Sequence, residues 1–248
     1  MTASLTVDRL TVRLGAVSIL KELSLEARSR NVLAVIGPPG AGKTALLKTM
    51  AGLWDATDGR IVLEHRSDVF ELDSSTRAEW HRRVGMAFQN DALFDALTVY
   101  ENVAFPLRRR AVDPREIDER VRQLLDQVGL QDAAQRLPAE ISGGMRKRCG
   151  IARAVVSKPV IGLFDDPTAG LDPETSDSIF ELIVEQSRTL SGICVVVSND
   201  LPSLLAVAKD VCVLHEGRLL FHGSPDAVAA CEEPVVHQFV RGAADGPL

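Results

Sequence analysis

The chain has 248 residues, of which 46% are hydrophobic and 25% charged, the composition of an ordinary globular protein with a substantial core. Its formal net charge of −6 offers no basic surface for a nucleic-acid backbone, so a nucleic-acid partner is not expected. The start, MTASLTVDRL, lacks the apolar core of a signal peptide, and no stretch approaches the roughly 18 apolar residues needed to span a bilayer.

The first third of the chain predicts strands around one helix. Apolar and polar residues alternate over residues 4–28, which predicts short antiparallel strands with one buried face. The run NVLAVIG is nearly continuous and β-branched, as expected for a parallel strand covered on both faces. A glycine-rich loop follows, then a helix from about Lys43 to Leu53 and another strand at RIVL.

From about residue 98 to 157 the pattern is helical. TVYE and DPRE both resemble helix starts with a cap and an acid three residues later, and Pro114 suits the first helical position. Strand-like runs return at residues 160–164, 193–197 and 211–214, with a helix over roughly 173–190. This alternation predicts an α/β fold with a parallel sheet. The tail RGAADGPL is small and polar enough to be loose.

The four cysteines (Cys149, Cys194, Cys212 and Cys231) are scattered and form no C-x-x-C pair. Three of them lie among apolar neighbours. We therefore expect buried free thiols in a reducing compartment.

The segment GPPGAGKT fits G-x-x-x-x-G-K-[ST] and lies between a buried strand and a helix, where a phosphate-binding loop belongs. Its glycines permit backbone angles that direct N–H groups at phosphate oxygens. The lysine supplies a positive charge for the outer phosphates, and the threonine a hydroxyl for Mg²⁺. The predicted nucleotide-binding residues of this loop are Gly37, Pro38, Pro39, Gly40, Ala41, Gly42, Lys43 and Thr44.

Two further segments carry candidate polar groups. Asp165 ends the apolar run IGLF, the expected place for a carboxylate that holds Mg²⁺ from a neighbouring strand end. ISGG, residues 141–144, precedes a long helix that stops before Pro159. Ser142 could simply cap this helix, but a glycine-flanked helix N-terminus is also a ready anion site.

Together these segments resemble the motifs of an ABC-type ATPase domain in the right order along nearly the whole chain. GPPGAGKT resembles the Walker A loop, Gln89 in AFQND the Q-loop, ISGGM the signature, LFDD Walker B and AGLD the D-loop. The resemblance implies a P-loop NTPase fold with a RecA-like parallel-sheet core, an N-terminal antiparallel β lobe and a helical signature subdomain. It implies one domain over residues 1–248, divided into a core with its β lobe at 1–89 and 158–230, a helical subdomain at 90–157 and a tail at 231–248.

The same resemblance implies a site shared between two chains, with ATP and Mg²⁺ as cofactors. Thr44, Gln89 and Asp165 would hold the metal ion. In this family two domains enclose two ATP molecules, and each site pairs one chain's Walker residues with the other's signature. Four residues would therefore act on the ATP of a second chain, in a homodimer or a heterodimer: Ser142, Gly143, Gly144 and Asp172.

Narrower features resemble the Mce-associated, Mla-type lipid-transport ATPases. Met145 replaces the usual signature glutamine, and NDALFDALTVYENVAFPLR and HQFVRGAADGP are similar to segments of that group. The resemblance implies a transmembrane permease partner, an Mce-type substrate-binding protein, a small regulatory subunit, and a cytoplasmic position on the inner face of the cell membrane. The permease should dock near Gln89, Asp91, Leu93 and Phe94, although Leu93 fits the core of the helical lobe equally well.

Three positions depart from the family pattern. Asp166 stands where a glutamate polarises the attacking water, and its carboxylate is withdrawn by about 1.5 Å, one C–C bond. Misplacement by about 1 Å can cost on the order of 10²-fold in rate. Asn199 replaces the switch histidine; it can donate to phosphate but cannot become cationic, and it could instead cap the following helix. Leu14 occupies the place of the aromatic residue that stacks on adenine.

These observations leave three functional hypotheses. The first is the ATPase subunit of a membrane lipid transporter, with Asp166, Asn199 and Gln89 as its catalytic residues and hydrolysis slowed by the departures. The second is a regulatory subunit that binds nucleotide, hydrolyses it poorly and pairs with a competent chain. The third is a soluble ABC protein of repair or translation, which the single domain and the acidic net charge disfavour.

Overall fold

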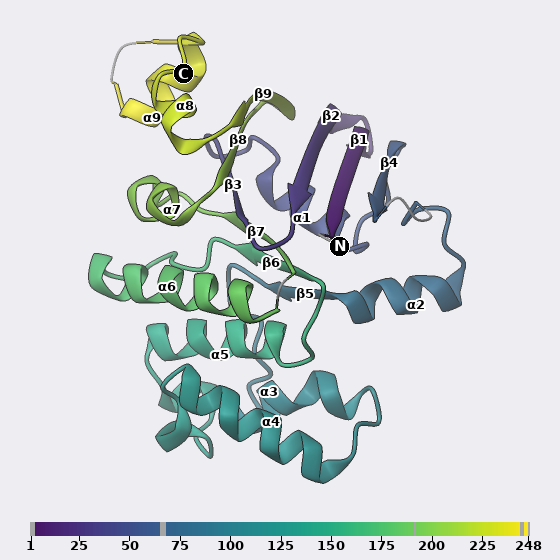
Figure 1. The fold of residues 1–248 in the computed structure, drawn as a ribbon, viewed down its shortest axis with the longest axis vertical. Helices are drawn as coiled ribbons and strands as arrows, with labels where there is room; N and C mark the ends of the chain where they lie inside the picture. Colours follow the sequence, from purple (N-terminus) through teal and green to yellow (C-terminus); the bar gives the residue numbers. More distant parts are fainter. Residues whose placement is uncertain (1–2, 65–67, 191, 244–245, 248) are drawn as a thin grey trace.

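The computed structural model describes residues 3–64, 68–190, 192–243 and 246–247, and the structural statements here concern those residues. An antiparallel sheet with the strand order β2-β1-β4 forms the N-terminal lobe (Figure 1). Its strands are β1 (Ser4–Leu14), β2 (Val17–Arg28) and β4 (Asp58–Leu63). The alternation of buried and exposed residues along β1 confirms the predicted period-two strands.

A second sheet of six strands runs through the middle of the molecule in the order β5-β6-β7-β3-β8-β9. Strands β5, β6, β7, β3 and β8 are parallel, and β9 pairs antiparallel with β8. This confirms the α/β fold with a parallel sheet. The strands are β3 (Val32–Ile36), β5 (Val84–Ala87), β6 (Ile161–Asp165), β7 (Ile193–Val197), β8 (Asp210–His215) and β9 (Arg218–Gly223).

The parallel sheet is buried on both faces, because alternate residues of each central strand enter two different cores. In β3, Val32, Ala34 and Ile36 pack with the helices on one face. Leu33 and Val35 pack with the antiparallel sheet and α1 (Lys43–Met50) on the other. A strand with two buried faces reads as a continuous apolar run, which explains the sequence NVLAVIG.

Helices cover the first of these faces. Helices α5 and α6 lie side by side below the parallel sheet, with α3 and α4 beneath them (Figure 1). As predicted, Thr98 forms a capping box at α3 and Asp113 caps α4, with Pro114 at its first position. The elements are α2 (Ser74–Arg83), α3 (Val99–Arg108), α4 (Pro114–Gln127), α5 (Gly143–Val155), α6 (Pro173–Leu190), α7 (Leu201–Val207), α8 (Pro225–Ala229), α9 (Pro234–Arg241) and the 3-10 turns Gln131–Ala133 and Pro138–Glu140.

Some boundaries differ from the sequence expectation. Helix α1 ends at Met50 rather than near Leu53, and α9 continues to Arg241, into the segment expected to be loose. Residues 244–245 and 248 of that segment lie outside the described part of the chain. Cys149, Cys194 and Cys212 are buried free thiols as expected, whereas Cys231 is half-buried.

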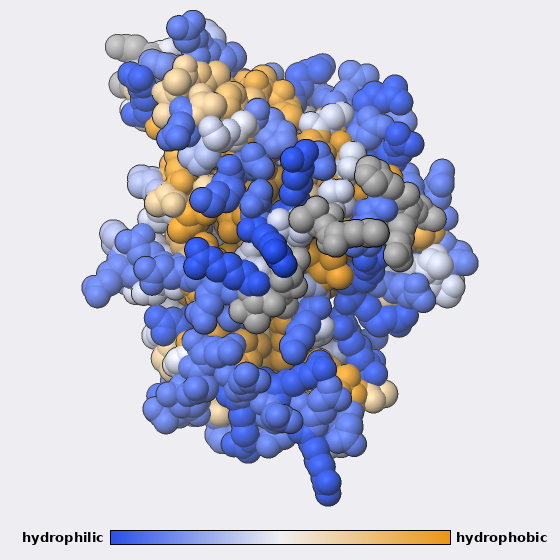
Figure 2. All heavy atoms as spheres, viewed as in Figure 1, coloured by the Kyte–Doolittle hydropathy of each residue, from blue (hydrophilic) through white to orange (hydrophobic). Residues whose placement is uncertain are grey.

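Hydrophilic side chains cover most of the face seen in Figure 2, and apolar residues show chiefly between elements and around the C-terminal helices. None of the described helices is both long and apolar enough to cross a membrane. The exposed large hydrophobic side chains are Leu14, Val17, Leu53, Phe94 and Leu137.

Candidate functional site

The loop of residues 37–42 joins the carboxyl end of β3 to the start of α1, as predicted for a phosphate-binding loop. Gly37 has a φ of 147°, and a Cβ there would lie 2.0 Å from the carbonyl oxygen of Leu214. Gly42 precedes α1 with a φ of 101° and contributes no side-chain cap. The first N–H groups of α1 therefore have no capping side chain, and such a helix start suits an anion.

Lys43 places its ammonium inside this loop. Its Nζ donates to the carbonyl oxygens of Gly37 at 2.6 Å and Pro38 at 3.0 Å, and the residue is only 8% exposed. Burial lowers the pKa of Lys43, while the carboxylates of Asp166 and Asp165 act in the opposite direction. The loop thus holds a desolvated positive charge next to backbone donors, an arrangement that suits phosphate oxygens.

Thr44 and Asp165 meet although they are 121 positions apart in the sequence. The Thr44 hydroxyl donates to Oδ1 of Asp165 at 3.0 Å, because the start of α1 lies against the end of β6. Burial raises the pKa of Asp165, and the hydrogen bond from Thr44 opposes that rise. A hydroxyl and a carboxylate within hydrogen-bond distance of each other offer hard oxygen ligands. Mg²⁺ binds such oxygens and completes its coordination with phosphate oxygens and water. The donor set fits that ion.

Asp166 follows directly in a left-handed conformation, with a φ of 47°. Its N–H donates to the carbonyl of Val197 at 2.8 Å, which fixes this turn against β7. The side chain of Asn199 donates from Nδ2 to Oδ2 of Asp166 at 2.9 Å, and Gln89 Nε2 donates to the same oxygen at 3.3 Å. The structure thus brings together the three residues expected to be catalytic. Gln89 contacts Asp166 here, and its predicted role as a third ligand of Mg²⁺ beside Thr44 and Asp165 stays a prediction.

Ser198 was not singled out from the sequence, yet it is fully buried at this site. Its Oγ donates to Oδ1 of Asp166 at 3.3 Å and accepts the N–H of Asp200 at 3.0 Å. The suggestion that Asn199 caps the following helix is wrong. Asp200 caps α7, accepting the N–H of Ser203, so the Asn199 side chain is available to Asp166.

The signature and D-loop residues line a hollow of 390 Å³, to which no phosphate-loop residue contributes. Ser142 caps α5, its Oγ accepting the N–H of Met145, so the expected capping role is confirmed. Asp172 accepts the N–H and the hydroxyl of Thr175 at the start of α6, and these bonds lower the pKa of Asp172. Gly143 and Gly144 complete the wall between them.

The segment after Gln89 is held by the signature helix. Lys147 of α5 donates to the carbonyl oxygen of Gln89 and pairs with Oδ1 of Asp91 at 3.0 Å. Arg153, also on α5, donates to the carbonyls of Asp91 and Ala92 at 2.7 Å each. These contacts could not be predicted from the sequence, because they join residues about 60 positions apart.

The expected docking region is partly apolar. Phe94 is 43% exposed, its ring centroid lies 4.6 Å from that of Phe105, and the Arg153 guanidinium lies over it at 5.8 Å. Leu93 is half-buried against the helical core, which agrees with the alternative that it belongs to the core of the helical lobe. Leu14, in the adenine-stacking position, is half exposed opposite Val17.

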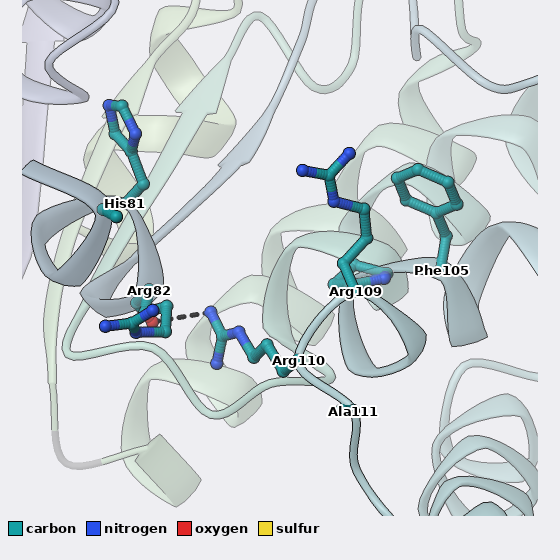
Figure 3. A pocket seen from close by; sticks show the side chains of 8 residues that line it. His81, Arg82, Phe105, Arg109, Arg110 and Ala111 are labelled. Atoms are coloured by element: carbon teal, nitrogen blue, oxygen red, sulfur yellow. Dashed lines mark hydrogen bonds between the residues drawn. The ribbon is translucent and has the colours of Figure 1, made fainter. Parts of the chain in front are cut away.

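Phe105 also lines a separate hollow of 780 Å³, which opens between α2 and the end of α3 (Figure 3). We call it the basic hollow; its lining residues are Ala78, His81, Arg82, Phe105, Pro106, Arg109, Arg110 and Ala111. Arg110 donates to the carbonyls of Arg82 and Ser157, which ties the chain after α3 to the end of α2 and to the turn after α5.

Comparison with known proteins agrees with this geometry. The sequence profile of the ABC transporter family matches residues 20–169. The intermembrane phospholipid transport system ATP-binding protein MlaF of Escherichia coli K12 is 36% identical over 231 residues, which cover 93% of this chain and 86% of that protein. This confirms the resemblance to Mla-type ATPases.

Solved structures share the whole fold. CbiO1 of Clostridium perfringens, described as part of the ABC transporter complex cbiONQ, superposes with a TM-score of 0.84 at 28% identity, covering 92% of this chain and 91% of that one. The ATP-binding cassette MJ0796, in a dimeric structure bound to ADP and Pi, has a TM-score of 0.81 at 26% identity, covering 89% and 98%. The chain therefore belongs to the ABC transporter family, as an ATP-binding subunit with ATPase activity.

Proposed function

We propose that this chain is the ATP-hydrolysing subunit of a phospholipid transporter of the Mla type. The observation that carries the ATPase assignment is the contact of Thr44 with Asp165 beneath a loop that buries the Lys43 ammonium. The lipid assignment rests on the similarity to MlaF, whose name describes phospholipid transport. Met145 in the signature agrees with it.

Within the site, each group has a separate task. The N–H groups of the loop and Lys43 bind the phosphates of ATP. Thr44, Gln89 and Asp165 would hold Mg²⁺, which would neutralise charge on those phosphates. Asp166 orients and polarises the attacking water, and Asn199 and Gln89 set the position of its carboxylate. The signature hollow of a second chain closes the site, since Ser142 and Asp172 line a hollow to which the phosphate loop of the same chain contributes no residue.

A permease partner anchors the complex to the inner face of the membrane, with an Mce-type protein and a small regulatory subunit as further members. We place the docking surface of the permease on Phe94 and the adjoining basic hollow. Arg82 and Arg109 are exposed there beside the half-buried Phe105, so the docking segment should carry carboxylates and an apolar side chain. The division into a core, a helical subdomain at 90–157 and a tail at 231–248 remains a prediction.

One observation favours a second candidate, a nucleotide-binding regulatory subunit. Asp166 and Asn199 both depart from the groups expected for rapid hydrolysis, while the phosphate loop and the signature are intact. Such a chain would complete the site of a competent partner in a heterodimer. The two candidates differ in the turnover of the purified chain.

The test is phospholipid transfer by the intact complex. The complex is purified in mild detergent from its native membranes through a tag on this chain and reconstituted into phospholipid vesicles. Movement of a fluorescent phospholipid to acceptor vesicles is then measured with and without Mg²⁺ and ATP. We expect ATP-dependent transfer that Lys43→Ala abolishes. Transfer that persists with Lys43→Ala, or ATP turnover without any lipid movement, contradicts the proposal.

The docking surface is tested in the same preparation. Arg109→Glu reverses a charge in the basic hollow, whereas Arg115→Glu makes the same change on the exposed face of α4. We expect Arg109→Glu to reduce the amount of permease that co-purifies and Arg115→Glu to leave it unchanged. Equal recovery from both variants would place the permease elsewhere.

A further inference from the structure

The two catalytic positions that depart from the family pattern touch each other. Nδ2 of Asn199 lies 2.9 Å from Oδ2 of Asp166. Oδ2 also accepts Gln89 Nε2 at 3.3 Å, while Oδ1 accepts the Ser198 hydroxyl at 3.3 Å and the Asn199 N–H at 3.4 Å. These four donors surround the carboxylate, three of them at 3.3–3.4 Å, and Asp166 is only 6% exposed. Its side chain is therefore fixed by its neighbours rather than by solvent.

The space around this carboxylate is matched to short side chains. A glutamate at position 166 would extend the acid by about 1.5 Å, one C–C bond. The Asn199 amide is already at hydrogen-bond distance, so the longer acid must displace it or turn away from it. A histidine at position 199 would bring a ring where an amide now ends. Either change therefore disturbs the contact, and the effect of one change depends on the residue at the other position.

We propose that Asp166 and Asn199 form a matched pair in which Asn199, together with Ser198, positions the shortened carboxylate for its task. The proposal rests on the proposed role of Asp166 in hydrolysis. It assigns Asn199 a task besides any contact with phosphate, and it makes Ser198 a positioning residue. The Ser198 hydroxyl is suited to this because it links Asp166 to the N–H of Asp200, at the start of α7.

The first test is a double-mutant cycle made of the native chain, Asp166→Glu, Asn199→His and the double variant. Each protein is unfolded in urea without nucleotide, and its kcat and KM for ATP are measured with Mg²⁺. We expect each single change to lower kcat by about tenfold or more with little change in KM, because the phosphate loop is untouched. In the double variant the changes in kcat and in the free energy of unfolding should be non-additive, because both substitutions alter the same contact.

The matched control is the pair Asn31→His and Asp226→Glu, which makes the same chemical changes at residues of two separate elements, one just before β3 and one in α8. These two changes should be additive in stability and leave kcat unchanged. Additive effects at 166 and 199 in both measurements would overturn the matched pair and leave the ATPase assignment standing. Coupling in urea without turnover in any variant would instead support the pair and refute hydrolysis by this chain.

Ser198 is tested separately. Ser198→Ala removes the hydroxyl, while Ser198→Thr keeps it. A positioning role predicts that Ser198→Ala lowers kcat without raising KM and that Ser198→Thr restores part of the lost kcat. If both variants lose only stability, and kcat of the folded fraction is native, Ser198 is structural and this part of the proposal fails.

Discussion

The ion pair between Lys147 and Asp91 should contribute both to stability and to the position of Gln89. Lys147 lies on the signature helix, and the exposed fractions of the two side chains are 9% and 14%. Removing one partner of a buried pair leaves an uncompensated charge, at a cost of about 3–5 kcal/mol. Because Asp91 keeps some contact with water, we take the lower end, roughly 3 kcal/mol. For a chain of this length each kcal/mol lowers Tm by about 2 °C, so Lys147→Met should lower Tm by about 6 °C.

The functional consequence follows from the second contact of Lys147, which donates to the carbonyl oxygen of Gln89. Without this anchor the Gln89 amide should leave Asp166, and we expect kcat to fall on the order of tenfold, with KM for ATP nearly unchanged. Calorimetry and a coupled ATPase assay measure the two effects.

The control is Arg122→Met on α4. Its pair with Asp118 is similarly short, at 2.9 Å, but the two side chains are 71% and 48% exposed. Exposed pairs contribute little, so Tm should hardly change. A second comparison is Lys147→Met combined with Asp91→Asn, which removes the stranded charge and should recover part of the lost Tm. If Lys147→Met lowers Tm no more than Arg122→Met does, the loss of Lys147 leaves no costly buried charge on Asp91, and the reasoning is refuted.

Three further predictions concern single groups. Mg²⁺ and ATP at 100 times Kd should stabilise the native chain by about 2.7 kcal/mol, and Lys43→Ala should abolish this stabilisation. Lys209→Ala, on an exposed turn, should keep it. A rise in Tm with Mg²⁺ and ATP that persists in Lys43→Ala would refute the phosphate site. Burial raises the pKa of Asp165 above 3.8, so its contribution to stability is present at low pH and is lost as pH rises through the raised pKa. Asp165→Asn should therefore flatten that part of the stability curve in urea titrations across pH, and an unchanged curve would contradict it. Cys231 alone should react rapidly with a thiol reagent in the folded chain, because the other three thiols are buried, and mass spectrometry would reveal a second labelled site if this is wrong.

The sequence predicted the elements whose apolar pattern is strong. The run NVLAVIG became β3 and ICVVV became β7, because strands covered on both faces must be apolar throughout. Helix α2 was not predicted, because its apolar pattern is weak. Among the residues whose burial is described, Trp80 is the only buried one in α2, so no helical period of apolar residues exists there.

Within the site, the sequence predicted the chemical groups better than their contacts. The phosphate loop and the Thr44–Asp165 pair could be expected, because a motif fixes the type and place of each group. The pairing of Asp166 with Asn199 could not, since nothing in single positions 33 apart shows that they touch. The assignment of the α7 cap failed for a local reason: Asn199 and Asp200 are adjacent and both can cap a helix, and only the structure shows which side chain turns back.

Residue 166 is an aspartate, shorter by one methylene than the expected glutamate. Strand order explains why side chains, and not the backbone, must adjust to the shorter acid. Gln89, Asp166 and Asn199 each lie just beyond the carboxyl end of a strand, and these strands, β5, β6 and β7, are neighbours in the sheet. Asp165 pairs in register with Val197, and the N–H of Asp166 donates to the same residue's carbonyl. A slide of about 1.5 Å along β6 would break this ladder, so the backbone cannot restore the reach of the missing methylene. The adjustment therefore falls on the donors that surround the carboxylate, and the Asn199 amide, at 2.9 Å, makes the shortest of these contacts.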